Sequence, residues 1–329
     1  MLKLCMINDL EDNEKAKIDK FIMDRATNGE FINTIRYLSY HRNRFKGDSV
    51  VVFDKESHEI RGVMLAAAEE DGKTIISHCG TTFAGPVISL KSSINLVEEI
   101  LDLILCYYEK KYKRIELKVS PVHFGFQPNG MIDYFLLRRG YFYRMTGLSN
   151  IIHISRINSV DDALILCNSK RRNQIRNVIK KNKFQFKEKK LDEIVWQKMN
   201  ENMMRKFGKQ ATHTFREIEQ LYQMFPDYIR AFYVETYEGI YGAFGLVYCF
   251  KNIFHTQYLD LNYSFSKDSP NLLLILELIM KARELGYEYF SFGASTEKDG
   301  ELLNYGLHQY KAEYGGGDII LPLYMKETV

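Results

Sequence analysis

The sequence predicts a mixed α/β protein of the α+β class, built from two tandem domains of one fold. Three observations lead to this prediction. The chain has 329 residues, more than one hydrophobic core usually serves. A series of short strands, a helix and a further strand occurs twice along it. In each copy the strands precede the helix, an order typical of α+β rather than doubly wound α/β domains.

The first copy of the series occupies the N-terminal half. β-Branched and other apolar residues alternate there with short polar turns, as expected for strands. Ser92 and Ser93 stand where a helix can be capped. The expected elements are strands at residues 49–53, 60–66 and 74–78, a helix that ends near residue 110, and a strand at 114–119.

The second copy repeats this order in the C-terminal half. Ser269 can cap a helix that has Pro270 at its first position, and Gly286 suits the residue after its end. The expected elements are strands at residues 231–234, 240–246 and 253–258, a helix over 270–285, and a strand at 287–292.

Corresponding residues of the two copies support an internal duplication. Ile240 and Gly242 take the place that Ile60 and Gly62 have in the first copy. His255 likewise takes the place of His78. We therefore expect an N-terminal domain over residues 1–150 and a C-terminal domain over residues 151–329.

Composition narrows the class of protein. A hydrophobic content of 46%, with 26% charged residues, is ordinary for a soluble globular chain. The net charge of +3 gives no general reason to expect nucleic-acid binding. No apolar run reaches the roughly 18–20 residues that span a bilayer, and the first residues lack the apolar core of a signal peptide. We expect a cytoplasmic protein, and its oligomeric state stays open.

The five cysteines point the same way. They are odd in number, widely scattered and form no CxxC pair, so neither a disulfide framework nor a zinc site is expected. No other cluster of His, Cys or carboxylate residues has metal-ligand spacing. We therefore predict no metal.

Residues 290–317 carry the strongest functional signal. A short apolar strand runs into a Gly-Ala-Ser-Thr turn, and a glycine run ends the stretch. Glycine allows positive φ and close backbone approach. More polar side chains gather beside this strand end than structure alone needs, which indicates a binding site. They are Ser295, Thr296, Asn304, Gln309 and Lys311.

The same stretch resembles a known family. Phe-x-Phe-Gly-x-Ser-Thr at 290–296, Leu-Asn-x-Gly-Leu at 303–307 and aromatic-Lys-x-x-aromatic-Gly-Gly at 310–316 are similar to the C-terminal signature of the FemAB-like branch of the GNAT acyltransferase superfamily. The resemblance extends over nearly the whole chain. It implies two tandem GNAT-like domains and an acyl- or aminoacyl-transferase activity.

By this resemblance, Lys311 is the first catalytic candidate, with Tyr310 beside the substrate. In the family the matching lysine stabilises the oxyanion that develops on the reacting carbonyl. An ammonium group placed there stabilises the transition state more than the ground state. The alternative is a solvated lysine near a helix end, where the helix dipole favours it.

Residues 255–258 match a His-x-Gln-Tyr stretch of the same family. Strand alternation places His255 and Gln257 on one face and the side chains of Thr256 and Tyr258 on the other. If the first face looks into the cleft between diverging central strands, His255 is a second catalytic candidate and Gln257 binds substrate. The match to the family stretch makes Tyr258 a further binding candidate. The alternative is a row of polar residues on a half-exposed sheet face.

Residues 77–86 resemble a Ser-His-x-Gly-x-Thr segment of the family. His78 has a side chain suited to general base catalysis, and Thr82 is a binding candidate. Alternatively, His78 is a hydrogen-bonded residue that closes a sheet edge. His41 and His213 rank third, because a lone histidine is more often structural.

A basic run separates the two copies. From Lys170 to Lys190 there are ten Lys and Arg residues and one acid. Residues 170–176 resemble the Lys-x-Arg-x-x-Ile-Arg segment of the family, and Arg172 and Arg176 are candidates for holding a substrate phosphate. The run also suits a tRNA backbone. The alternative is a solvated helix face.

The co-substrate stays unknown. GNAT enzymes that use acetyl-CoA bind its pyrophosphate on a glycine-containing loop at a helix N-terminus. Residues 264–271 contain no glycine, and Pro270 removes one amide. Acetyl-CoA binding in the usual manner is therefore not expected, which leaves acyl-CoA bound differently or aminoacyl-tRNA.

Together these features predict transfer of an activated acyl group onto an amine or hydroxyl. The acceptor would be a phosphate-bearing cell-wall, polysaccharide or nucleotide-sugar precursor. One alternative is a non-catalytic module that binds a nucleotide-sugar or a partner protein. Another is tRNA binding without transfer.

Overall fold

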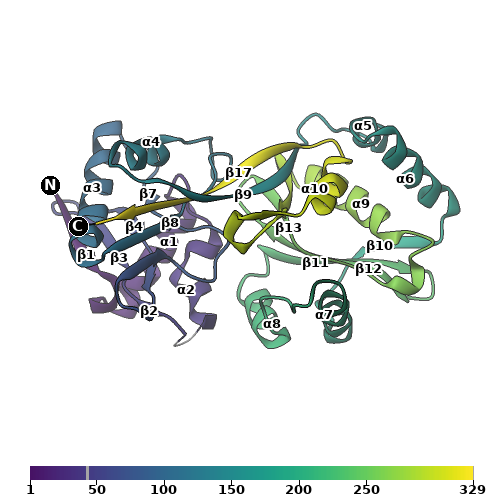
Figure 1. Ribbon diagram of the computed structural model, residues 1–329, viewed down its shortest axis with the longest axis horizontal. Coiled ribbons are helices and arrows are strands. Elements are labelled where there is room, and N and C mark those ends of the chain that lie inside the picture. The colour runs from purple at the N-terminus through teal and green to yellow at the C-terminus, as the bar shows by residue number, and fades with distance from the viewer. Residues whose placement is uncertain (42–43, 329) are drawn as a thin grey trace. The chain divides into compact units, whose positions relative to one another are not determined.

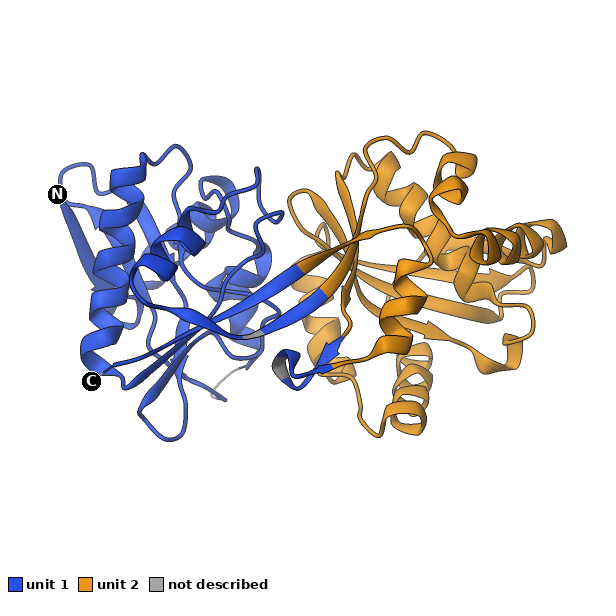
Figure 2. Ribbon diagram, turned by 45° about the horizontal axis from the view of Figure 1, so that its top comes forward, with its two compact units in different colours: residues 1–148, 296–302, 320–329 blue, residues 149–295, 303–319 orange. Residues whose placement is uncertain are grey.

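The computed structural model describes residues 1–41 and 44–328, and Figure 1 shows its helices and strands. The chain forms two compact units, coloured separately in Figure 2. The boundaries between the units fall within strands β9 (Phe142–His153) and β17 (Gly317–Glu327). Unit 1 contains residues 1–148, 296–302 and 320–329, and unit 2 contains residues 149–295 and 303–319.

Unit 1 has two sheets around helix α3. One sheet is antiparallel in the order β1-β3-β4-β7. In the other, β8 lies between β6, to which it is parallel, and the end of β17. The elements of unit 1 are β1 (Leu2–Met6), α1 (Asp12–Asp24), α2 (Ile35–Leu38), β2 (Lys46–Gly47), β3 (Val50–Asp54), β4 (Ile60–Met64), β5 (Ala66–Ala68), β6 (Thr74–Ser77), β7 (Val87–Ile88), α3 (Ile94–Lys111), β8 (Arg114–Lys118) and α4 (Met131–Arg138), with 3₁₀ turns at Ile7–Asp9, Phe31–Asn33 and Ser39–His41.

Unit 2 is built on one sheet in the order β10-β11-β12-β13-β14, followed by the end of β9. Helix α9 packs on one face of it, and α7 and α8 cover the other (Figure 1). The elements are α5 (Val160–Leu166), α6 (Ser169–Lys181), β10 (Phe184–Glu188), α7 (Glu193–Phe207), α8 (Phe215–Met224), β11 (Ile229–Thr236), β12 (Tyr241–Cys249), β13 (Ile253–Leu261), a 3₁₀ turn (Tyr263–Phe265), α9 (Pro270–Glu284), β14 (Tyr289–Ala294) and α10 (Tyr305–Ala312). Near the unit boundary lie β15 (Thr296–Glu297), a 3₁₀ turn (Lys298–Gly300) and β16 (Leu302–Leu303).

The predicted internal repeat is confirmed. Strands β3, β4 and β6, helix α3 and strand β8 form the first copy, and β11, β12, β13, α9 and β14 form the second. In both copies the third strand runs parallel to the strand that follows the helix, β6 to β8 in the first copy and β13 to β14 in the second. The side chain of Ser93 caps α3, as predicted, by accepting from the amide of Leu96 at 3.3 Å.

Two local predictions are wrong. The predicted strand at 60–66 divides between the two sheets, because the Ala66 amide donates to the Ser49 side chain at 3.0 Å instead of continuing the pairing of β4. Helix α9 begins at Pro270, but Ser269 does not cap it. Ser269 has a φ of 54°, and its hydroxyl donates to the Ser266 carbonyl at 3.3 Å instead.

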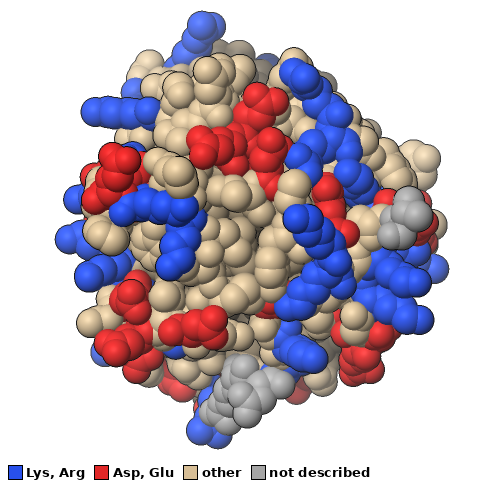
Figure 3. Space-filling model, turned by 90° about the vertical axis from the view of Figure 1, so that its left-hand side faces the viewer, with Lys and Arg blue, Asp and Glu red and all other residues tan. Residues whose placement is uncertain are grey.

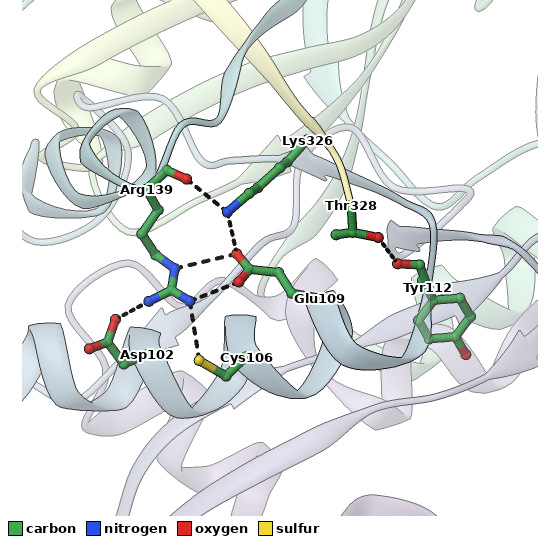
Figure 4. A network of polar contacts seen from close by, with 7 residues as sticks. All are labelled: Asp102, Cys106, Glu109, Tyr112, Arg139, Lys326 and Thr328. Carbon is green, nitrogen blue, oxygen red and sulfur yellow. Dashed lines mark hydrogen bonds and ion pairs between the residues drawn. The ribbon is translucent and has the colours of Figure 1, made fainter.

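The end of the chain returns to unit 1, which differs from the expected domain over residues 151–329. Residues 323–327 pair with β8, and Tyr324 is fully buried in the core of unit 1. Figure 4 shows the polar contacts that hold this segment on α3. The Lys326 amine donates to Glu109 at 3.0 Å and to the Arg139 carbonyl at 2.8 Å. The Thr328 hydroxyl donates to the Tyr112 carbonyl at 2.5 Å.

Charge on the end of unit 1 that carries α3 and β1 is mixed. Figure 3 shows Lys and Arg side chains interspersed with Asp and Glu over this face, with uncharged surface between them. A shallow groove of about 600 Å³ there is lined by Glu98, Glu99 and Asp102 as well as Lys110. This face therefore lacks the single-sign surface that binding to a phosphate backbone needs.

Candidate active site

The candidate site of unit 2 begins where β13 and β14 part. These parallel strands pair only over residues 253–255 and 289–291. Beyond that point side chains hold the backbone. The Ser291 hydroxyl lies 3.1 Å from Nδ1 of His255 and accepts from the Gly293 amide at 3.2 Å. The Thr256 hydroxyl donates to the Ser291 carbonyl at 3.2 Å.

A β-bulge shapes the end of β14. Between Ser291 and Ala294 this strand has one residue more than its partner β9. Gly293 lies in the bulge with a φ of 72°, a conformation that favours glycine. A Cβ atom there would lie 3.3 Å from Cε1 of His255. The sequence element Phe-Gly-Ala-Ser therefore allows the backbone to turn beside the histidine ring.

Lys311 of α10 is buried at this bulge. Its Nζ donates to the carbonyls of Gly293 at 2.9 Å and Ala294 at 2.6 Å. The side chain belongs to a residue that is only 5% exposed, and it forms no ion pair within the described residues. Burial lowers the pKa of Lys311 to about 7. An ammonium has three donors, so one N–H remains for a ligand.

His255 is neutral beside this lysine. Burial, and after it the charge of Lys311, lowers the pKa of His255 to about 3. A group of such low basicity is a poor general base at neutral pH. His255 therefore serves as a hydrogen-bonding group in the site. Of these two side chains, Lys311 is the one that changes its protonation state near neutral pH.

The titration of Lys311 predicts a pH-dependent stability. The pKa of Lys311 is about 7 in the folded protein and 10.5 for an ordinary lysine, as in the unfolded chain. Between these two pH values the unfolded chain binds one proton more than the folded protein, so the free energy of unfolding rises with pH. The free-energy difference between wild type and Lys311→Met should rise by about 1.4 kcal/mol per pH unit. Urea unfolding of both proteins at pH 7.5, 8.5 and 9.5 measures it, and a difference independent of pH contradicts the assignment.

Ser295 and Asn304 lie next to this group. The Ser295 hydroxyl is buried and has no hydrogen-bond partner within the described residues, which leaves it available to a ligand. The Asn304 amide donates to the Ser295 carbonyl at 2.9 Å. Its side chain accepts from the amide of Leu307 at 3.0 Å and so caps α10. The structure thus explains Asn304 as a helix cap.

Thr296 and Tyr310 have different surroundings. Thr296 belongs to unit 1, where its hydroxyl accepts from the Leu148 amide at 3.4 Å. Tyr310 is half-buried on α10, and its hydroxyl accepts from the Asn271 side chain at 3.1 Å. The structure therefore places Tyr310, but not Thr296, in the same unit as Lys311.

The predicted alternation along β13 is wrong, because a second bulge interrupts it. Tyr258 pairs with Leu246 and Thr256 with the next residue, Val247, so Gln257 has no partner on β12. Thr256 and Tyr258 consequently lie on opposite faces. Tyr258 lies instead on the face of His255, where its hydroxyl is 2.7 Å from Nδ1 of His213. Gln257 is half-buried.

The two arginine candidates of α6 differ in their contacts. The Arg172 guanidinium donates to the carbonyls of Leu164 at 2.9 Å, Ile165 at 3.1 Å and Cys167 at 2.9 Å. These carbonyls close α5, so Arg172 has a structural role. The Arg176 side chain, by contrast, is exposed on α6.

His78 and Thr82 belong to unit 1, whereas Lys311 belongs to unit 2. His78 is buried, with its ring stacked 5.6 Å from that of His41, and Nδ1 lies 2.5 Å from the Cys79 carbonyl. Burial lowers the pKa of His78 to about 4. Thr82 is exposed. His78 thus occupies in unit 1 the end of the parallel strand that His255 occupies in unit 2.

Several site residues escaped the sequence analysis. Ser291 looks like an ordinary strand residue, and Asn271 like part of a helix start. Tyr314 was noted only as part of a motif, although the spacing of Tyr310 and Tyr314 predicts neighbours on one helix face. Arg171 stood unnoticed within the basic run, yet its side chain is 9% exposed.

The N-terminus of α9 has the features that the sequence indicated. Asp268 lies just before it and pairs with Lys181 at 3.1 Å and Lys183 at 2.9 Å. A groove of about 460 Å³ between α6 and this helix start is lined by Lys180, Lys181 and Lys267 together with Asp268. The residues that line this groove include no glycine.

The side chains of residues 1–41 and 44–328 form no group of three or more His, Cys, Asp or Glu that could hold a metal ion. None of the helices in this part of the chain combines the length and the hydropathy needed to cross a bilayer.

A known family matches part of this sequence, and solved structures share the whole of this fold. The profile of the acetyltransferase (GNAT) domain family matches residues 169–312. Over 95% of this chain and 96% of the other, the fold matches the crystal structure of FemX with a TM-score of 0.68 and 14% identity. The chain therefore has the fold of FemX, and its second half carries the sequence pattern of a GNAT acetyltransferase domain.

Two further solved structures share the fold of this chain. L-PGS from Bacillus licheniformis matches with a TM-score of 0.54 and 13% identity, over 96% of this chain and 90% of that one. A tandem GNAT protein from the clavulanic acid biosynthesis pathway matches with a TM-score of 0.51 and 10% identity, over 99% and 98%. No curated protein shows significant sequence similarity.

Proposed function

We propose that this protein is a FemAB-like GNAT enzyme, which transfers an activated acyl or aminoacyl group onto an amine or hydroxyl of a phosphate-bearing acceptor. The acceptor would be a cell-wall, polysaccharide or nucleotide-sugar precursor. One observation carries the proposal: the Lys311 amine is buried, has no carboxylate partner in the described structure, and is held by two carbonyls at the parting of β13 and β14.

The chemistry follows from that placement. The acceptor amine or hydroxyl attacks the acyl carbonyl, a C–N or C–O bond forms, and the bond from the carbonyl carbon to the leaving oxygen or sulfur breaks. Negative charge develops on the carbonyl oxygen in between. The free N–H of protonated Lys311 donates to that oxygen, in a site where little water weakens the interaction. The acceptor's proton leaves with the leaving group.

Neighbouring groups suit the rest of the substrate. The unpartnered Ser295 hydroxyl offers one hydrogen bond, and neutral His255 adds no charge that would compete with Lys311. Arg176, exposed on α6, is our candidate for the acceptor's phosphate. We no longer include Arg172 or Asn304 among the binding residues, because backbone groups occupy both side chains.

The donor is proposed to be an aminoacyl-tRNA or an acyl thioester bound without the usual pyrophosphate loop. The carboxylate of Asp268 and the proline at the start of α9 support this choice. The FemX and L-PGS folds favour the first alternative by likeness of fold. The missing loop equally motivates the second candidate function, a non-catalytic module that binds a nucleotide-sugar.

A transfer assay tests the proposal. The protein would be incubated with acyl-CoAs or charged bulk tRNA and a panel of nucleotide-sugars, and products detected by mass. A mass increase equal to one acyl or aminoacyl group on the acceptor is expected. Thermal shifts with the same panel show which compounds bind. A ligand at a concentration 100-fold above its Kd adds about 2.7 kcal/mol to the free energy of unfolding, which raises the melting temperature. Binding of a nucleotide-sugar without any product would favour the binding module.

A further inference from the structure

Arg171 stacks on two tyrosines, Tyr310 and Tyr314, at the C-terminal end of α10. The Arg171 guanidinium lies 4.7 Å from the ring centre of Tyr310 and 5.1 Å from that of Tyr314. It also pairs with the Glu313 carboxylate. Arg171 lies in the first turn of helix α6, whereas its three partners flank Lys311 in the sequence. The stack therefore connects α6 directly to the turn of chain that carries the candidate catalytic amine.

The tyrosines extend these contacts to two more elements. The Tyr310 hydroxyl accepts from Asn271 of α9 at 3.1 Å and lies 3.2 Å from the Tyr314 hydroxyl. The Tyr314 ring is buried 5.4 Å from the ring of Phe292 on β14. Since β14 also supplies the carbonyls that hold Lys311, the stack fixes α10 relative to the atoms that its lysine contacts.

Helix α10 needs such a fixation. It has only eight residues, and Lys311 is its one buried residue. In its first turns Tyr305 is 79% exposed, and Leu307 and Gln309 are also exposed. A helix this short is marginal on its own, and packing must hold it in place. The contacts of Tyr310, Glu313 and Tyr314 with Arg171 supply that packing.

Stability alone does not require a guanidinium at this place. Its pairing with Glu313 occurs at 9% and 13% side-chain exposure, where the desolvation of both charges offsets much of their attraction. Its Nε is buried and has no hydrogen-bond partner within the described residues. What an arginine adds over an apolar side chain is direction, because its planar fork fixes the carboxylate and both rings at once.

We propose that Arg171 is a positioning residue, which fixes α10 through Tyr310, Glu313 and Tyr314 so that the Lys311 amine stays on the carbonyls of Gly293 and Ala294. The significance of this position for acyl transfer rests on the proposed function. The fixation itself does not, and it can be measured on the free protein. The titratable groups that face Lys311 and the stack are His255 of β13, the Cys167 thiol that follows α5, Glu313 and the two tyrosines.

The test compares Arg171→Gln with Arg230→Gln. Arg230 is a matched control, because it also pairs with a carboxylate, that of Glu188, and lies 5.6 Å from an aromatic ring, that of Phe232. It belongs to β11, three strands away from β14 in the sheet. Each protein would receive trace acetic anhydride between pH 5 and 11, and peptide mass spectrometry would give the acetylation of Lys311 relative to exposed Lys170.

In wild type and Arg230→Gln, Lys311 should titrate near pH 7. In Arg171→Gln the midpoint should rise by one unit or more, because a loosened α10 admits water to Nζ, and Arg171→Lys should lie between. Equal midpoints in Arg171→Gln and wild type would overturn the proposal, as would an equal shift in both glutamine variants. Unfolding midpoints from urea melts show whether each variant is folded.

Turnover separates this inference from the proposed function. Once a substrate is known, Arg171→Gln should lower kcat about 10- to 100-fold with little change in KM, whereas Arg230→Gln should leave both unchanged. A shifted Lys311 midpoint in a protein that transfers no acyl group would support the positioning role and remove the proposed function. An unshifted Lys311 midpoint in Arg171→Gln, together with wild-type turnover, would support the proposed function and remove the positioning role.

Discussion

Replacing Lys311 by Met is expected to lower kcat for acyl transfer by about 100- to 1000-fold, the usual effect of losing one oxyanion donor. Methionine keeps the length of the buried side chain but offers no N–H to the carbonyl oxygen of the donor. Affinity for the acceptor should change little, because the lost interaction forms in the transition state. Single-turnover kinetics at saturating donor measures the effect.

A suitable control is Lys281→Met, since Lys281 lies near the C-terminal end of α9 and pairs only with Glu284, at 3.0 Å, on the surface. Its turnover should equal that of wild type. The pH profile of kcat adds a second criterion. If Lys311 donates in its protonated form, its contribution declines as pH rises through about 7. Unchanged kcat in Lys311→Met would remove the lysine from the mechanism.

The second large effect is expected from Tyr324→Ala in the returning strand of unit 1. This side chain is fully buried, stacks 4.7 Å from the Tyr143 ring and donates to Asp133 at 2.7 Å. Truncation should destabilise unit 1 by about 3–5 kcal/mol, as for other buried aromatic residues. It would also leave the Asp133 carboxylate without this donor.

Hydrogen exchange with mass spectrometry can assign that loss to one unit. Peptides from α3 should exchange faster in Tyr324→Ala, whereas peptides from α9, in unit 2, should keep their protection. Tyr305→Ala is the control, because Tyr305 is 79% exposed and its removal should change stability by less than about 0.5 kcal/mol. Unaltered protection of α3 in Tyr324→Ala would contradict the assigned role of the strand.

Much of the fold could be predicted because its signals are local. The serine cap of α3, and the proline and glycine that bracket α9, act within a few residues of each helix end. The division of β4 from β5 could not be predicted, since it depends on the Ser49 side chain meeting Ala66 from another strand. The return of β17 to β8 depends in the same way on a distant partner.

The site shows the same distinction. Lys311 and Ser295 were predicted from a motif that folds locally around a glycine bulge, and the structure brings Lys311 and His255 together. Arg171 was missed, because a basic run is normally solvated and only its contact with Tyr310 and Tyr314 buries it. The bulge at Gln257 leaves no mark in the sequence, since no residue there requires it.

The returning strand also sets an order of events during biosynthesis. Residues 1–148 emerge from the ribosome first, yet the strand segment that completes their sheet lies at residues 320–327. At about 5–20 residues per second, that segment follows roughly 9–36 s later. Until then β8 presents an unpaired edge, which is the kind of surface that joins other chains. The half of the protein that is made first is therefore completed last, and its yield in the cell should depend on chaperones that protect the nascent chain during this interval.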